Sequence, residues 1–96
     1  MDKICNPEWM EKIAEEMDNI ANEYINAKTV LDYPKFNSYH EAISVIREEF
    51  EELWDEIKIQ KKDMPQVLSL SQHQKIRKEA IQLGAMVLGF IVKLTE

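Results

Sequence analysis

The chain has 96 residues, with 18 acidic and 12 basic side chains and a formal net charge of −6 at pH 7. This length corresponds to a single domain, residues 1–96. A domain of this size has a modest core, which oligomerisation would help to complete. The negative charge argues against binding to a nucleic-acid polymer, which needs Lys and Arg to replace phosphate counterions. It is compatible with a single nucleotide that is carried in with a divalent cation.

The sequence contains one cysteine, Cys5, which is too few for an internal disulfide or a zinc cluster of several cysteines. The beginning, MDKICNPEWMEK, lacks the continuous apolar stretch of a signal peptide. The longest uncharged run, Leu83 to Val92, is too short to span a bilayer. We therefore expect a soluble, cytoplasmic protein with no membrane partner.

The first predicted helix begins at Asn6-Pro7, because asparagine is a good N-cap and proline fits the first helical position. Apolar residues then recur at intervals of three and four, which is typical of the buried face of an amphipathic helix. They are Met10, Ile13, Met17, Ile20, Tyr24 and Ala27. Pro34 disfavours helix at Tyr33 and predicts a loop there.

The second predicted helix runs from about Tyr39 to Lys61, with Ser38 and Glu41 at the positions of a capping box. On a helical wheel centred on Phe50, one apolar stripe forms the predicted core face. Its other members are Ile43, Ile46, Leu53, Trp54 and Ile57. A solvated flank is predicted for Glu48, Glu51 and Asp55.

The third predicted helix begins near Ser71 or Gln72 and continues to the end of the chain. The preceding segment, VLSLSQ, fits either a short extra helix or an irregular link. Apolar residues cover nearly the whole circumference of the third helix, so we expect a partner subunit to bury part of it. Ala80 and Gly84 would let another helix approach closely. Since no segment alternates like a strand, the sequence predicts an all-α bundle of three main helices, completed by oligomerisation.

The opposite flank of the second helix carries Glu49, Glu52 and Glu56, which are neighbours on the helix surface. Like charges placed this way repel, and a hard cation such as Mg²⁺ or Mn²⁺ would neutralise them. The alternative is an acidic face in water with basic counter-charges. Candidates for those counter-charges are Lys61, Lys62, Lys75 and Arg77.

The third helix offers Glu79 and Gln82, three residues apart at the border of the predicted core. A carboxylate there that faces the second helix would complete a metal site between the two helices. The alternative is that Glu79 pairs with Lys75 or Lys78 at the rim.

The runs NSYHEAISVIREEFEELWDEIKIQKKD and IRKEAIQLGAMVLGFIVKL resemble the MazG-like superfamily of all-α nucleotide pyrophosphohydrolases, in particular a short subgroup common in phages and prophages. That family has an ExxE motif in one helix and an ExxD motif in a later one. The first matches Glu49-Phe50-Glu51-Glu52, and the longer EExxE form begins at Glu48. The resemblance covers about Asn37 to Leu94.

The resemblance implies that Glu49, Glu52 and Glu79 bind Mg²⁺ or Mn²⁺, with Gln82 as a fourth ligand. Water would then attack the α-phosphorus of a nucleoside triphosphate and release the monophosphate and pyrophosphate. Glu49 and Glu52 would be catalytic through the ion, and Glu56 would join a second ion or position the water. The family also implies a homodimer or homotetramer.

One residue departs from the family pattern, because Gln82 stands where the second motif has aspartate. An amide oxygen still reaches a cation but removes one negative charge. Further expected contacts to the nucleotide are His40, Phe36 and Lys75. The alternative for His40 is a surface or capping role, and for Phe36 it is anchoring of the loop.

Three functions remain open from the sequence. The first is a metal-dependent nucleotide pyrophosphohydrolase. The second is a non-catalytic protein on the same fold that captures a nucleotide or a nucleotide-derived signal, as a phage could use against host defence; Gln82 motivates it. The third is a helical interaction protein whose acidic flank only keeps it soluble.

Overall fold

The computed structural model describes residues 7–63 and 70–95, and for residues 59–63 it describes the backbone only. These residues form three α-helices, α1 (Glu8–Asn26), α2 (Tyr39–Asp63) and α3 (Leu70–Leu94), and a short π-helix, η1 (Ala27–Leu31), with no strand among them. The all-α class and the three main helices are therefore confirmed. The N-cap of α1 is Pro7, with an extended ψ of 154°, so the helix begins one residue later than predicted. The predicted N-cap, Asn6, lies outside the described residues. Of the segment VLSLSQ, residues 67–69 lie outside the described residues and residues 70–72 are the first turn of α3.

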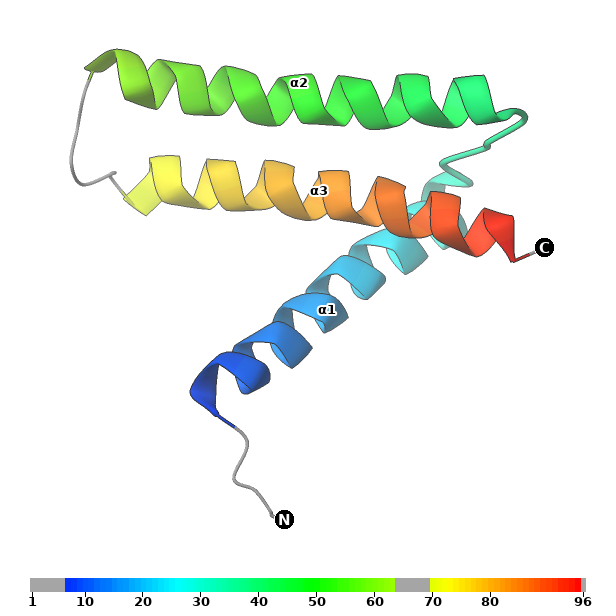
Figure 1. Ribbon diagram of the computed structural model, residues 1–96, viewed down its shortest axis with the longest axis horizontal. Coiled ribbons are helices and arrows are strands. Elements are labelled where there is room, and N and C mark those ends of the chain that lie inside the picture. Colours follow the sequence, from blue (N-terminus) through cyan, green and yellow to red (C-terminus); the bar gives the residue numbers. More distant parts are fainter. Residues whose placement is uncertain (1–6, 64–69, 96) are drawn as a thin grey trace.

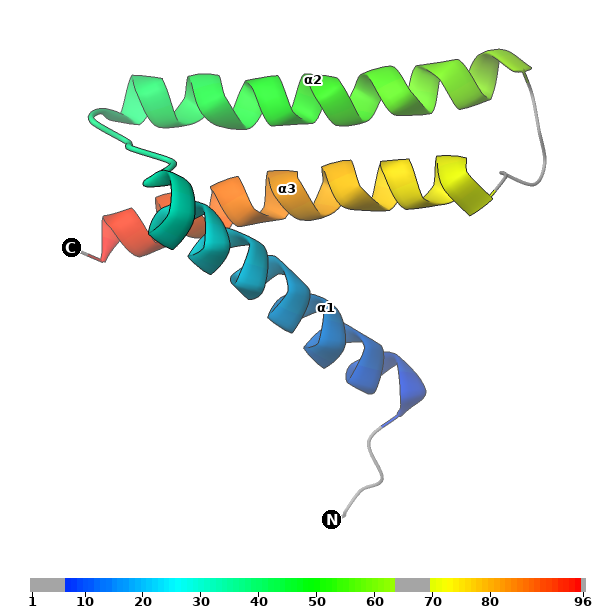
Figure 2. The ribbon, with the colours of Figure 1, turned by 180° about the vertical axis from the view of Figure 1, so that it is seen from behind.

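Helices α2 and α3 lie side by side and antiparallel, and α1 crosses α3 at an angle (Figures 1 and 2). The end of α1 and η1 lie near the C-terminal half of α3, whereas the N-terminal half of α1 diverges from the other two helices. Helices α2 and α3 therefore form a hairpin, and α1 leans across α3.

Two glycines of α3 allow α1 to approach closely. A Cβ atom on Gly84 would lie 3.1 Å from Cδ1 of Ile20, and one on Gly89 would lie 2.9 Å from Cε1 of Tyr24. The close approach predicted at Gly84 is confirmed, but Ala80 is exposed and takes no part in a buried contact. The crossing point is instead set by Gly84 and Gly89, with α1 of the same chain as the neighbour.

The linker after η1 turns the chain toward α2. Asp32 adopts a left-handed conformation with φ of 52°, which aspartate tolerates better than most residues. The capping box at the start of α2 is confirmed, because the Glu41 N–H donates to Ser38 Oγ at 3.0 Å. The Glu41 carboxylate in turn accepts the Asn37 N–H at 2.7 Å, so the reciprocal bond falls one residue before the cap.

The buried face of α2 differs from the predicted one. Ala42 is fully buried, whereas Phe50 is 54% exposed and Trp54 is 43% exposed. The prediction was wrong here because α3 packs against the face that carries Ala42 and Glu49, about a quarter turn from Phe50 on the wheel. The solvated flank predicted for Glu48, Glu51 and Asp55 is exposed as expected.

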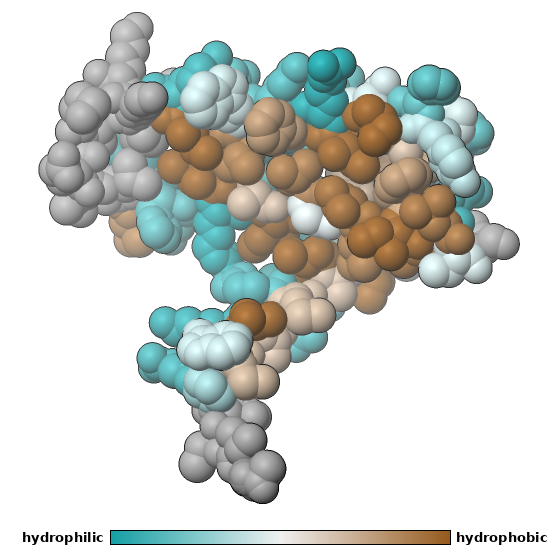
Figure 3. Space-filling view, viewed as in Figure 1, coloured by the Kyte–Doolittle hydropathy of each residue, from teal (hydrophilic) through white to brown (hydrophobic). Residues whose placement is uncertain are grey.

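The core of a single chain is small. Among the residues whose side chains the structure describes, the buried apolar ones are Ala27, Phe36, Ala42, Ala85 and Met86. The predicted apolar face of α1 packs only at its C-terminal end, because Met10, Ile13 and Met17 lie on the diverging half and are largely exposed. Apolar side chains also gather along α2 and α3 on the face seen in Figure 3.

Candidate metal site

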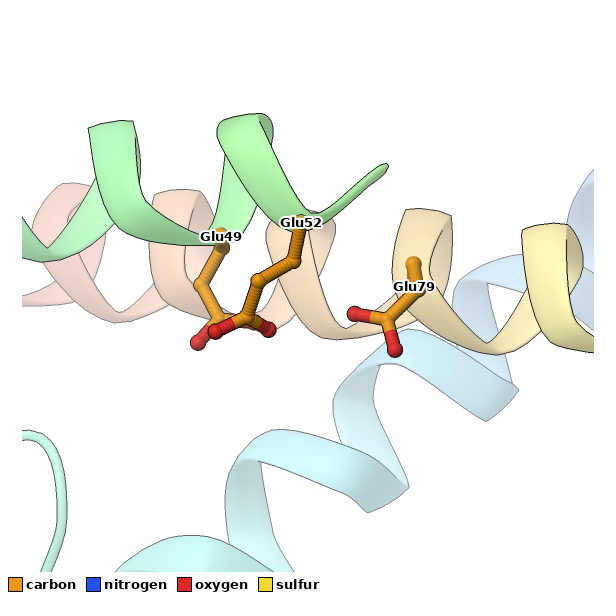
Figure 4. Close-up of side chains that lie close together, drawn as sticks. All are labelled: Glu49, Glu52 and Glu79. Atoms are coloured by element: carbon orange, nitrogen blue, oxygen red, sulfur yellow. The ribbon is translucent and has the colours of Figure 1, made fainter. Parts of the chain in front are cut away.

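Two helices bring three carboxylates together. Glu49 and Glu52 lie one turn apart on α2, and Glu79 comes from α3. One oxygen atom from each of the three carboxylates lies within 4.8 Å of the other two. Figure 4 shows the side chains from α2 and the one from α3 directed toward the same space. We call these three residues the carboxylate cluster.

Two oxygen atoms of the cluster are buried without a hydrogen-bond partner, Oε1 of Glu49 and Oε1 of Glu79. Buried polar atoms in native proteins nearly always have a partner, and one without it calls for an explanation such as an ion. Both residues are half-buried, while Glu52 is exposed. The cluster is therefore most exposed to solvent at Glu52 and less exposed at Glu49 and Glu79.

Burial raises the pKa of Glu49, and the negative charges of nearby carboxylates raise it further. Glu52 and Glu79 contribute most among these charges, followed by Glu48 and by Glu23 from α1. A raised pKa means that the surroundings disfavour the ionised form. A bound divalent cation would lower the pKa again, because it stabilises the ionised carboxylate that the neighbouring negative charges disfavour.

The pKa of Glu79 is raised for the same reasons, with burial first and the adjacent Glu52 carboxylate second. Lys78 lowers this pKa, and Glu56 raises it slightly. Glu56 is thus near enough to Glu79 to act on it, although it is not one of the three clustered side chains. Lys78 places one positive charge at the edge of the cluster.

Tyr33 is a neighbour of the cluster that sequence reasoning did not place there. Burial raises the pKa of its phenol, and so do the charges of Glu49, Glu48 and Glu52. Helical periodicity could not reveal this proximity, because Tyr33 lies in the linker between η1 and α2. The only sequence signal was its position directly before Pro34 in the predicted loop.

The basic side chains expected as counter-charges to the acidic flank lie in different surroundings. Arg77 pairs with Glu16 of α1, with Nη2 2.7 Å from Oε2, so this contact joins α1 to α3. Lys75 is exposed, one turn before Glu79 on α3. The side chains of Lys61 and Lys62 lie outside the described residues.

Two predicted nucleotide contacts lie toward the other end of the hairpin. The ring of Phe36 packs edge-on against Phe90, with 6.2 Å between the ring centroids. Phe90 is eleven residues beyond Glu79, roughly 16 Å along α3. His40 is exposed and lies nine residues before Glu49, roughly 13 Å along α2. This ring contact agrees with the alternative of loop anchoring stated for Phe36, while its contact to a nucleotide stays a prediction.

Gln82 follows Glu79 by one turn of α3 and is half-buried. Its spacing of three residues from Glu79 places it on the same side of the helix.

Comparison of the chain with protein-family models, curated proteins and solved structures gave no match. Across residues 7–63 and 70–95, none of the helices combines the length and apolar character needed to cross a membrane. What the fold and the site define is an all-α chain with a carboxylate cluster between two antiparallel helices.

Proposed function

We propose that the chain is a MazG-like, metal-dependent nucleotide pyrophosphohydrolase that converts a nucleoside triphosphate to the monophosphate and pyrophosphate. One observation carries the proposal: Glu49, Glu52 and Glu79 converge from two helices, with buried oxygen atoms that lack partners. An acidic flank that serves only solubility gives no reason to turn two carboxylates inward, where burial disfavours their charge.

The residues present fit a hard divalent cation. Carboxylate oxygens are the ligands that Mg²⁺ and Mn²⁺ prefer, and both ions keep positions for water and phosphate oxygens. Glu49, Glu52 and Glu79 would hold the ion, and Gln82 would offer an amide oxygen. With the ion bound, the charge of the triphosphate is neutralised and its α-phosphorus is oriented for attack by water.

The remaining groups are arranged for positioning and proton transfer. Glu56 borders the cluster through its influence on Glu79 and could accept a proton from the attacking water. Lys78 lies on the same border and would attract a phosphate oxygen. The exposed carboxylate of Glu52 marks the open side, where the nucleotide would enter.

We also propose that the chain assembles as a homodimer or as a pair of dimers. Large apolar side chains are exposed on all three helices of the single chain, among them Met17 on α1, Phe50 and Trp54 on α2 and Ile91 on α3. Exposed apolar patches of this kind mark interaction surfaces. A second copy that covers them would supply the core that one chain lacks.

A second candidate function is capture of a nucleotide or nucleotide-derived signal without turnover, and Gln82 favours it. Replacing the aspartate of the second motif with an amide removes one negative charge from the ligand set. A weaker metal site would bind a phosphate chain but activate it less.

The two functions are separated by incubating the chain with a panel of nucleoside triphosphates and cyclic nucleotides, with Mg²⁺ or Mn²⁺, and chromatographing each mixture. The hydrolase yields monophosphate and pyrophosphate, and Glu52→Gln abolishes both products. Glu51→Gln, on the solvated face of the same helix, is the matched control and keeps the activity. A ligand that stabilises the chain but returns intact supports capture, and a panel with neither cleavage nor stabilisation contradicts both.

A further inference from the structure

A pocket lies at the far end of the hairpin from the carboxylate cluster. It has a volume of about 220 Å³ and is formed where the end of α1, η1, the linker and the C-terminal half of α3 meet. Its lining residues are Tyr24, Lys28, Pro34, Lys35, Phe36, Asn37, Gly89 and Lys93. Gly89 follows Glu79 by ten residues, roughly 15 Å along the helix, so the two sites are separate.

The walls of this pocket carry three lysines and no acidic residue. That composition is unusual in a chain with 18 acidic and 12 basic residues. Lys28, Lys35 and Lys93 come from η1, the linker and α3, so the fold, not the local sequence, gathers them. Three positive charges around one cavity repel one another, and an anion inside it would offset that repulsion.

All three lysines have contacts of their own. Lys28 Nζ donates to the carbonyl oxygen of Pro34 at 3.4 Å, and Lys35 Nζ lies 3.2 Å from a carboxylate oxygen of Asp32. An ammonium group carries three donors, so one such contact does not exhaust it. Both side chains can therefore hold these contacts and also donate to a ligand.

Part of the pocket lining is apolar and buried. Pro34 is buried, and Phe36 is only 8% exposed. Gly89 lets Tyr24 and Pro34 converge, since a Cβ there would lie 2.9 Å from Tyr24 Cε1 and 3.5 Å from Pro34 Cγ. The side chain of Asn37 adds a neutral polar group to the wall.

We propose that this pocket binds a phosphate group, independently of any divalent cation. A phosphate offers several oxygens and close to two negative charges, which suits a pocket lined by three lysines better than a single carboxylate does. The cavity is smaller than the range of roughly 300–1,000 Å³ typical of drug-sized ligands. It therefore holds inorganic phosphate or the head of a small phosphate monoester whose organic part rests on the apolar floor.

The proposal is tested by isothermal titration calorimetry of the full chain, in EDTA, with inorganic phosphate and with phenyl phosphate. We expect saturable binding that weakens with added salt, because the contacts are partly exposed ion pairs. In the double variant Lys28→Gln/Lys93→Gln the affinity falls about tenfold or more, which is about 1.4 kcal/mol. Tighter binding of phenyl phosphate identifies a monoester, and equal or tighter binding of inorganic phosphate identifies the free ion.

Two controls make the result specific. Lys58→Gln removes an exposed lysine of α2 that pairs with Asp55 at 3.2 Å, and it leaves the affinity unchanged. Glu52→Gln alters the carboxylate cluster and also leaves it unchanged, so failure of the proposed hydrolase and failure of this pocket are distinguishable. The proposal is overturned if neither probe binds, or if Lys58→Gln weakens binding as much as the double variant does.

Discussion

Replacement of Glu49 with glutamine tests whether repulsion among the three carboxylates of the cluster destabilises the folded chain. The variant keeps the size of the side chain and removes one of three mutually close charges. Glu49 is the best choice because it is half-buried and the charges of Glu52 and Glu79 both raise its pKa. Without a metal ion, we expect Glu49→Gln to be more stable than the natural chain at neutral pH.

The size of the effect follows from the geometry. Two unit charges 4.8 Å apart repel by about 3.5 kcal/mol at an effective dielectric constant of about 20, and by about 0.9 kcal/mol in bulk water. The cluster is open to solvent at Glu52, so the net gain lies between these limits, at about 1–2 kcal/mol. Each 1 kcal/mol raises the melting temperature of a domain of this size by about 4–8 °C.

The assay is thermal and urea unfolding of both proteins in EDTA, followed by circular dichroism. Glu51→Gln is the matched control, because it removes the same charge from the exposed face of the same helix. Its stability is expected to change by about 0.5 kcal/mol or less. The reasoning is refuted if Glu49→Gln is no more stable than this control.

Other predictions concern pH, helix packing and assembly. Because the pKa values of Glu49 and Glu79 are raised, the folded chain keeps protons that the unfolded chain has lost. The free energy of unfolding therefore falls as the pH rises from 4.5 through the raised pKa values. Urea unfolding midpoints that rise across this pH range contradict the prediction. Gly89→Ala pushes against Tyr24 and lowers stability in urea by about 1–3 kcal/mol, whereas Gly84→Ala, which meets the flexible end of Ile20, costs less. Phe50→Gln lowers the dimer fraction in sedimentation velocity, and a natural chain that sediments as a monomer contradicts the proposed assembly.

Much of the fold follows from local patterns in the sequence. Spacing of three and four places the helices, and Ser38 with Glu41 predicts the start of α2 to the residue. The wheel also separated Glu49 from Glu48 correctly, since the first is half-buried and the second exposed. These predictions succeed because capping and helical periodicity act over only a few residues.

Features set by the packing of distant segments could not be predicted. The wheel placed Phe50 and Trp54 in the core because they are apolar, but it does not tell which face α3 covers. Tyr33, in the linker, lies near enough for the charge of Glu49 to raise the pKa of its phenol, and no helical period links the two residues. The π-helix η1 also went unpredicted. The MazG-like resemblance and the metal ion stay predictions.

Binding of Mn²⁺ to the natural chain tests the metal site most directly. Electron paramagnetic resonance of free Mn²⁺ in a titration gives the number of bound ions and their affinity. We predict saturable binding that Glu79→Gln weakens strongly, and that Glu51→Gln leaves unchanged, because Glu79 alone among the cluster comes from α3. No saturable binding, or equal loss in both variants, would mean that the carboxylate cluster is not a metal site.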